Sequence, residues 1–205
     1  TLDILRYIGV NAKDRKMYVP VSRDSQIRTR EALEKGGISE SDTVVAINPG
    51  ASCPSKRWPA KRFAEVADTL IKKHGVKIVV MSGEADKRIG KDMVSFMQEK
   101  CLDLSGKTTV GDIAGILKRS KLFISNDSGP VHVACAIGTP VVAIFGRSDR
   151  GLSPKRWGPS NKGDIVLHKY VGCLNCLAHN CVFGFKCLHA ITVDEVVKSA
   201  EELLR

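Results

Sequence analysis

The segment 126–132, NDSGPVH, contains the residue types of a phosphate-binding site. It follows an apolar run, and Pro130 suits the first turn of a helix, where its missing N–H costs nothing. The free N–H groups and the positive dipole end of such a turn favour an anion. Gly129 permits close approach, and Ser128 and His132 add a hydroxyl and an imidazole donor. The segment therefore predicts phosphate binding, with a plain helix N-terminus and a core histidine as the alternative.

Two other segments follow apolar runs and carry groups that suit the same ligand: NPGAS with Lys56, and SGE, which ends at Glu84. Lys56 lies in a loop containing Gly and Ser, as a phosphate-binding lysine does, although the loop is not a P-loop. Glu84 could bind the two hydroxyls of a ribose or only cap the next helix. Asp127 would repel a phosphate, so we expect it to accept from sugar hydroxyls or to fix the amides of its loop. A G-x-G-x-x-G fingerprint is absent from the sequence, which disfavours nicotinamide and flavin cofactors.

The elements that must position these residues alternate along the chain. Short β-branched or apolar runs are predicted as strands at 43–47, 76–81, 102–104, 122–125, 140–145 and 165–167. Segments of helical period are predicted as helices at 24–35, 59–74, 85–100, 110–119, 130–137 and 193–204. Runs that are apolar on both faces and joined by helices require a buried parallel sheet. The fold class predicted is α/β, a Rossmann-like doubly wound sheet whose ligands bind at the carboxyl ends of the strands.

Charge is concentrated in two segments of this 205-residue chain, which has 32 Lys and Arg against 22 Asp and Glu. Segments 53–62 and 147–162 each carry a formal charge of +4, out of +10 in total. Clustered cations indicate a localised anionic ligand rather than a uniformly basic surface, the alternative being solvated loops pinned by Trp58 and Trp157. Because no apolar run approaches the roughly 20 residues that span a bilayer and no signal-peptide pattern opens the chain, we expect a soluble, cytoplasmic protein.

The motifs NPGAS, KRWP, VVMSGE and SNDSGPVHVACAIGTPVVAIFG together resemble the carboxyl-terminal half of glycosyltransferase family 9, the ADP-heptose:lipopolysaccharide heptosyltransferases and their relatives. The resemblance covers residues 43–205. It implies a GT-B architecture, in which a second Rossmann-like lobe holds the nucleotide-sugar donor and the first lobe holds the acceptor. The chain opens at Thr1 with an amphipathic pattern, so residues 1–22 are interpreted as a connector from a missing amino-terminal lobe and 23–205 as the donor-binding domain.

The resemblance also implies roles for individual residues. Asp127 would meet the transferred sugar and Glu84 lies near the residue that holds the ribose. The diphosphate contacts implied are Ser52, Lys56, Ser128, Gly129 and His132. The family's catalytic base, an Asp of the other lobe, has no counterpart here, so we expect no catalytic residue and almost no turnover from this chain alone.

The mechanism implied is an inverting transfer in lipopolysaccharide inner-core assembly. Lys56, the helix amides and His132 would stabilise the departing diphosphate, so no metal cofactor is required. The partners expected are a nucleotide-sugar donor and, through the missing lobe, a lipopolysaccharide-core acceptor. Nucleic acid is not expected, and membrane contact would be at most peripheral, at the inner face of the inner membrane.

Four of the seven cysteines cluster near the carboxyl end of the sequence, at Cys173, Cys176, Cys181 and Cys187. Cys-x-x-Cys suits half of a structural zinc site, but the remaining spacing is tighter than usual. Zinc is therefore an alternative that is not favoured over a disulfide or free thiols, and an iron–sulfur cluster ranks below both. Cys101 and Cys135 are expected in the core.

Two other functions compete with the donor-binding lobe. A nucleotide-sugar epimerase of GT-B-like build would need catalytic carboxylates and histidines, and few acidic residues follow these strands. A zinc-dependent nucleic-acid-binding module would use the cysteine cluster and the basic segments, but these contain few aromatic residues and no base-reading motif.

Overall fold

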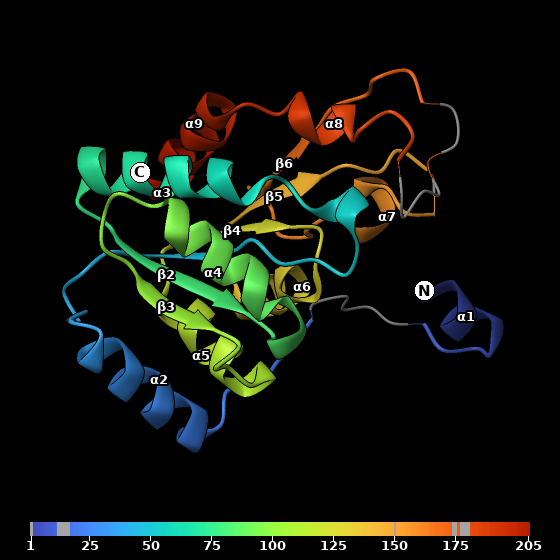
Figure 1. Ribbon diagram of the computed structural model, residues 1–205. Coiled ribbons are helices and arrows are strands. Elements are labelled where there is room, and N and C mark those ends of the chain that lie inside the picture. Colours follow the sequence, from blue (N-terminus) through green and yellow to red (C-terminus); the bar gives the residue numbers. More distant parts are fainter. Residues whose placement is uncertain (1, 12–16, 150, 174–175, 177–180) are drawn as a thin grey trace.

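A parallel β-sheet forms the centre of the computed structural model, which describes residues 2–11, 17–149, 151–173, 176 and 181–205. Within this part of the chain six strands lie in the order β3-β2-β1-β4-β5-β6, and every neighbouring pair is parallel (Figure 1). The strands are β1 (Val44–Asn48), β2 (Lys77–Ser82), β3 (Leu102–Ser105), β4 (Leu122–Asn126), β5 (Val141–Phe145) and β6 (Ile165–His168). The direction of winding reverses between β1 and β4, as in doubly wound sheets. The predicted fold class is confirmed.

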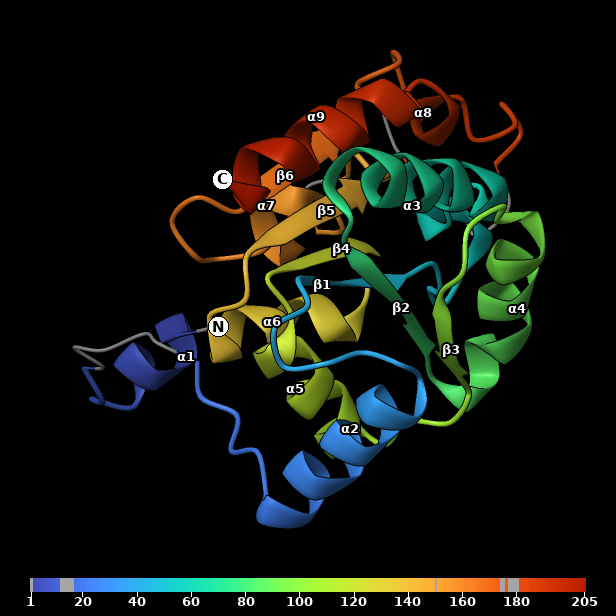
Figure 2. The ribbon, with the colours of Figure 1, turned by 90° about the vertical axis from the view of Figure 1, so that its left-hand side faces the viewer.

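Helices cover both faces of the sheet. The described helices are α1 (Leu2–Tyr7), α2 (Arg23–Lys35), α3 (Ala60–His74), α4 (Lys87–Phe96), α5 (Val110–Arg119), α6 (Gly129–Ile137), α7 (Pro154–Trp157), α8 (Lys186–His189) and α9 (Val193–Leu204), with short 3-10 turns η1 (Pro54–Lys56) and η2 (Glu84–Asp86). Figure 2 shows α3, α8 and α9 on one face and α2, α5 and α6 on the other. α1 stands apart from these layers in both views. Among the described helices, none has the length and apolar character needed to cross a bilayer.

The core explains why the strand predictions succeed. Successive residues of β1 point to opposite faces, so that Val45 packs in the cluster under α3 and α9 and Val44 in the cluster under α5 and α6. All five residues of β1 are buried. A strand buried on both faces must be apolar along its whole length, and each of the six observed strands lies within one residue of a predicted run.

Helix boundaries differ from the prediction where tertiary contacts intervene. The helix predicted at 85–100 is instead η2 followed by α4, which ends at Phe96. The buried carboxylate of Asp68, on α3, accepts from the N–H groups of Gln98 at 2.9 Å and Glu99 at 3.0 Å. These N–H groups are therefore unavailable to a continuing helix. Pro130 is the second residue of α6 rather than the first.

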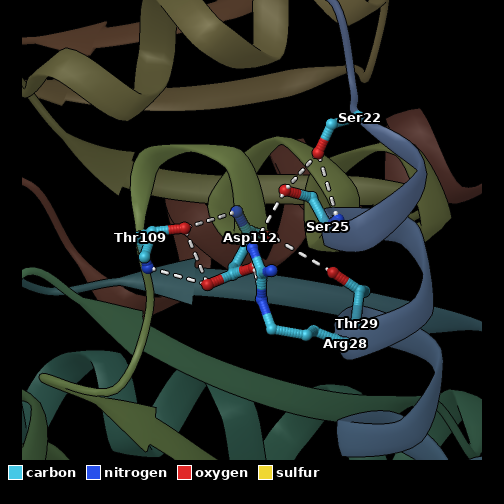
Figure 3. A network of polar contacts seen from close by, with 6 residues as sticks. All are labelled: Ser22, Ser25, Arg28, Thr29, Thr109 and Asp112. Atoms are coloured by element: carbon cyan, nitrogen blue, oxygen red, sulfur yellow. Dashed lines mark hydrogen bonds and ion pairs between the residues drawn. The ribbon is translucent and has the colours of Figure 1, made fainter.

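Helices α2 and α5 are joined by the polar network drawn in Figure 3. α5 begins with a capping box: Thr109 Oγ1 accepts from Asp112 N at 3.2 Å, and Thr109 N donates to Asp112 Oδ2 at 3.0 Å. Arg28 of α2 places its guanidinium 2.7 Å from Asp112 Oδ1 and also donates to Ser25 Oγ. One carboxylate therefore both caps α5 and contacts α2.

Replacing Asp112 by alanine should lower the free energy of unfolding by about 1–2 kcal/mol, because a cap and a partly exposed ion pair are lost together. Burial raises the pKa of Asp112, but bonds from Thr109 and Arg28 outweigh it and hold the pKa below its ordinary value of 3.8. The carboxylate therefore stabilises the fold above that value, and its contribution is lost as the pH falls through the lower folded-state pKa. Urea titrations of the wild type and of Asp112→Ala at several pH values measure the difference in unfolding free energy.

The control for this variant is Asp92→Ala on the exposed side of α4, which should change the unfolding free energy by less than about 0.5 kcal/mol. A difference between wild type and the Asp112 variant that stays constant down to acid pH would contradict the role assigned to its charge.

Candidate ligand-binding cleft

A cleft of about 820 Å³ lies at the carboxyl ends of β1 and β4, where the order of the strands reverses. Ligands of doubly wound sheets bind at this position. Six of the seven predicted donor-binding residues line it: Ser52, Lys56, Asp127, Ser128, Gly129 and His132. The ammonium of Lys56 and the imidazole of His132 thus belong to one cleft, as a shared anionic ligand requires.

Glu84 is the seventh predicted residue, and the structure does not bring it into the lining. Its side chain is 72 % exposed and lies 3.2 Å from Lys87 Nζ. A Cβ built on Gly106 would stand 2.6 Å from Glu84 Oε2, so the carboxylate lies over the turn that follows β3. Asp86, two residues further along, lines the cleft instead.

Asp86 is paired with Arg57, and sequence reasoning overlooked both. Arg57 Nη2 lies 3.3 Å from Asp86 Oδ1, while Arg57 Nε donates to the carbonyl of Ala51 at 2.7 Å. Burial raises the pKa of Asp86, although Arg57 opposes the shift. A Cβ on Gly50 would come within 2.8 Å of this carboxylate, so the glycine is needed for the approach. Their place in the sequence could have indicated them, because both residues lie in loops that follow predicted strands.

Lys56 is paired as well. Its Nζ lies 2.8 Å from Oδ2 of Asp127, a side chain that is only 7 % exposed. That oxygen accepts no hydrogen bond within the described part of the chain, so Lys56 and Asp127 form an ion pair without a hydrogen bond. The lining therefore holds Lys56 and Arg57, each opposite a carboxylate. An anion entering the cleft must compete with Asp127 for the ammonium.

Two asparagines at the ends of β1 and β4 hold the loops of the cleft together. Asn48 Nδ2 donates to Ser128 Oγ at 2.9 Å, which links the end of β1 to the start of α6. Asn126 Nδ2 donates to the carbonyl of Pro49 at 2.7 Å, and its Oδ1 accepts from Trp58 N at 3.0 Å. These roles were not predicted. What the sequence shows is an asparagine as the last residue of each of these two buried strands.

The N-terminus of α6 offers fewer donors than the sequence predicts. Pro130 has no N–H, and Val131 N donates to the carbonyl of Ser128 at 3.1 Å. In the described structure, the first-turn N–H without a partner is that of Gly129. Gly129 lines the cleft, and a Cβ built on it would meet no atom within 4 Å.

The two tryptophans of the basic segments differ in environment. Trp58 is 1 % exposed and donates from Nε1 to the carbonyl of Ile191. It therefore anchors its loop, as expected if the tryptophans pin the basic segments. Trp157 is 40 % exposed and lines the cleft, with its ring centroid 6.2 Å from that of His132. The second tryptophan therefore forms part of the cleft wall, and its Nε1 also donates to the carbonyl of Gly151 in its own loop at 2.9 Å.

The four clustered cysteines line one small cavity of about 20 Å³ and are all free thiols. Burial raises the pKa of the Cys187 thiol, and the neighbouring cysteines add to the shift. No group of ligating side chains in the described residues is arranged to hold a metal ion; His179, which lies within the cysteine cluster in the sequence, is outside the described residues. Of the two cysteines expected in the core, Cys135 is buried and Cys101 is half-buried. The zinc alternative stays an untested prediction.

The strand order and the cleft at its reversal point define a Rossmann-like lobe of the kind that binds nucleotides. Residues 4–186 match the model of glycosyltransferase family 9 (heptosyltransferase). The chain therefore belongs to glycosyltransferase family 9, and its sheet is that of one lobe of a GT-B enzyme.

Curated and solved relatives agree with this assignment. Lipooligosaccharide heptosyltransferase 2 of Campylobacter jejuni is 29 % identical over 167 residues, which is 79 % of this chain and 51 % of the relative. The crystal structure of a family 9 glycosyl transferase from Veillonella parvula superposes with a TM-score of 0.82 at 30 % identity, covering 99 % of this chain and 58 % of that one. E. coli ADP-heptose LPS heptosyltransferase II gives 0.74 at 26 % identity, covering 91 % and 53 %. The chain spans about half the length of the curated relatives it matches.

Proposed function

We propose that this chain is the donor-binding lobe of an inverting glycosyltransferase of lipopolysaccharide inner-core assembly, and that it binds a nucleotide-sugar of the ADP-heptose type. The supporting observation is that Lys56, His132 and the N-terminus of α6 meet in one cleft at the strand reversal. A relative at 26 % identity is named as an ADP-heptose heptosyltransferase, which supports the donor class.

In this proposal the diphosphate lies over the N-terminus of α6. The unpartnered N–H of Gly129 donates to a phosphate oxygen, and Lys56 turns from Asp127 to the ligand. Ser52 and His132 supply further donors from the walls. Because no atom of the protein lies within 4 Å of a Cβ built on Gly129, the approach of a ligand would explain the lack of a side chain there.

The chemical role of the lobe is to stabilise the leaving group. During an inverting transfer, a base deprotonates the acceptor hydroxyl on one face of the sugar, while negative charge develops on the departing nucleoside diphosphate. Lys56, the α6 dipole and His132 stabilise that charge without a metal ion. Asp127, beside Lys56, is assigned to hydroxyls of the transferred sugar. The base and the lipopolysaccharide-core acceptor belong to the other lobe, so this chain alone should show almost no turnover.

The proposal places the protein in the cytoplasm, at the inner face of the inner membrane, with peripheral contact at most. Nucleic acid is not a partner in this proposal, because two of the cleft's cations are already opposite carboxylates rather than aligned on an open surface.

A thermal-shift screen of ADP, UDP, GDP and CDP tests the proposal. ADP at about 100 times its Kd should stabilise the fold by about 2.7 kcal/mol, which corresponds to a rise in Tm of about 5 °C or more. Adenosine, which lacks the diphosphate, should give a clearly smaller shift. An unchanged Tm in millimolar ADP, together with stabilisation by single-stranded DNA that falls steeply with salt, would point to the nucleic-acid-binding alternative.

Gly129→Val is the matched variant for this screen. A Cβ at this position meets no atom within 4 Å, so we expect the Tm without ligand to stay within about 2 °C of wild type. The valine side chain would occupy the proposed phosphate position, so the shift caused by ADP should disappear. An undiminished shift would place the diphosphate elsewhere.

A further inference from the structure

Arg147 is a buried cation that the roles assigned above do not use. It follows β5 by two residues and is 5 % exposed. Its Nε donates to Ser55 Oγ at 2.9 Å, and its Nη2 lies 2.8 Å from Cys53 Sγ. Within the described residues, no carboxylate lies at ion-pair distance from its guanidinium. A buried charge whose named partners are a hydroxyl and a thiol is costly, so its position calls for an explanation.

Arg147 contacts the turn that carries Lys56, a residue of the cleft lining. Both of its partners belong to the turn Cys53–Lys56, whose far end presents Lys56 to the cleft. A Cβ on Gly146 would come within 2.6 Å of the Ser55 carbonyl, so the backbone after β5 is packed tightly against this turn. The guanidinium is therefore fixed relative to the turn that carries the ammonium.

The charge of Arg147 also differs from that of the two cations in the lining. Lys56 and Arg57 each face a carboxylate, and their fields are largely cancelled before a ligand arrives. Ser55 and Cys53 leave the guanidinium uncompensated. The field of a buried charge is screened less by salt than that of an exposed charge, so it extends beyond the groups in direct contact. Arg147 is thus a cation, in contact with the turn of Lys56, whose charge is not balanced by any carboxylate of the described residues.

We propose that Arg147 is a positioning residue for the donor diphosphate: it holds the turn that carries Lys56 and supplies an uncompensated charge that favours an anion in the cleft. This inference rests on the proposed function and deepens it. It predicts that Arg147 affects ligands in proportion to their negative charge, whereas a residue that only braces the turn would affect charged and uncharged ligands alike.

The test compares ADP with adenosine by calorimetry on the purified protein. Arg147→Met should weaken ADP binding by about tenfold and leave adenosine binding within about twofold, because only ADP carries the diphosphate charge. Arg147→Lys, which keeps the charge, should bind ADP within about threefold of wild type. The matched control is Arg119→Met, whose guanidinium binds the carbonyls of Ser39, Glu40 and Asp42 away from the cleft and should leave both affinities unchanged.

Two results would overturn the inference while leaving the proposed function intact. One is ADP binding by Arg147→Met that equals wild type, and the other is an equal loss of ADP and adenosine affinity, which would make Arg147 a brace only. If Arg147→Met does not fold, Arg147→Gln retains hydrogen-bond donors without the charge and carries the same expectations. Failure of wild type to bind ADP at all would overturn the proposed function and, with it, this inference.

Discussion

Replacing Lys56 by alanine is expected to weaken ADP binding by about tenfold to a hundredfold, the range that corresponds to a charge-assisted hydrogen bond of about 1.5–3 kcal/mol. The loss has two sources. The ammonium is no longer available to the diphosphate, and the buried carboxylate of Asp127, now without its partner 2.8 Å away, repels the ligand. Calorimetric titration with ADP measures the change directly.

Asp127→Asn should act in the opposite direction. Without the carboxylate, Lys56 has no competing anion and the repulsion of the diphosphate is removed, so ADP should bind at least about threefold more tightly. In the double variant, the asparagine should recover part of the affinity lost with Lys56. This opposition distinguishes a competitive ion pair from two residues that bind the ligand independently.

Lys61→Ala is the matched control for this set. Lys61 belongs to the same basic segment but is exposed and outside the cleft, so its removal should change ADP affinity by less than about twofold. Equal effects of the Lys56 and Lys61 variants would show that the segment attracts ADP only by its net charge. That result would contradict the proposed direct contact between Lys56 and the ligand.

Replacing Trp58 by alanine is expected to lower the free energy of unfolding by about 3–5 kcal/mol, as for other large buried aromatic residues. The side chain is 1 % exposed, and its ring packs edge-on against Phe63 with centroids 5.0 Å apart. The variant also leaves the carbonyl of Ile191 without the indole donor, a bond of 3.1 Å. Because domains of this size are stable by about 5–15 kcal/mol, the loss is a large share of the total.

Urea denaturation of Trp58→Ala and Trp58→Phe separates the two contributions. Phenylalanine retains much of the packing but not the donor, so its cost should be about 1–3 kcal/mol. Trp157→Phe is the control. The Trp157 side chain is 40 % exposed, so this substitution should lower the free energy of unfolding by less than about 1 kcal/mol. Equal destabilisation by the Trp58→Ala and Trp157→Phe variants would contradict the assignment of Trp58 as the anchor of its loop.

The balanced lining of the cleft has a consequence for binding. Lys56 and Arg57 are held by carboxylates in the absence of ligand, which lowers the attraction for small anions. In the proposed function, a diphosphate replaces Asp127 as the partner of Lys56 and accepts from the N–H of Gly129. If the proposal holds, this competition should favour a ligand that offers several phosphate oxygens at once over a small anion.

Much of the architecture could be predicted from the sequence because it depends on local patterns. Strands buried on both faces must be apolar throughout, and capping boxes at Thr109 and Thr192 mark the starts of α5 and α9 at the predicted residues. The gathering of Lys56 and His132 was also predictable, since the carboxyl ends of parallel strands meet at one edge of the sheet.

The tertiary structure alone decided how the charges are paired and where individual side chains lie. Lys56 and Asp127 are 71 positions apart in the sequence, and nothing local favours their contact. Glu84 and Asp86 both follow β2, yet only the second reaches the cleft, because Gly50 leaves room for its carboxylate. Arg147 belongs to a basic segment that looks exposed in the sequence, and it is buried because the loop after β5 packs on the turn at Ser55. Periodicity and composition determine the helices, the strands and the edge of the sheet at which a ligand binds. The partner of a charged side chain depends instead on distances between loops, and these are set only when the sheet and helices pack.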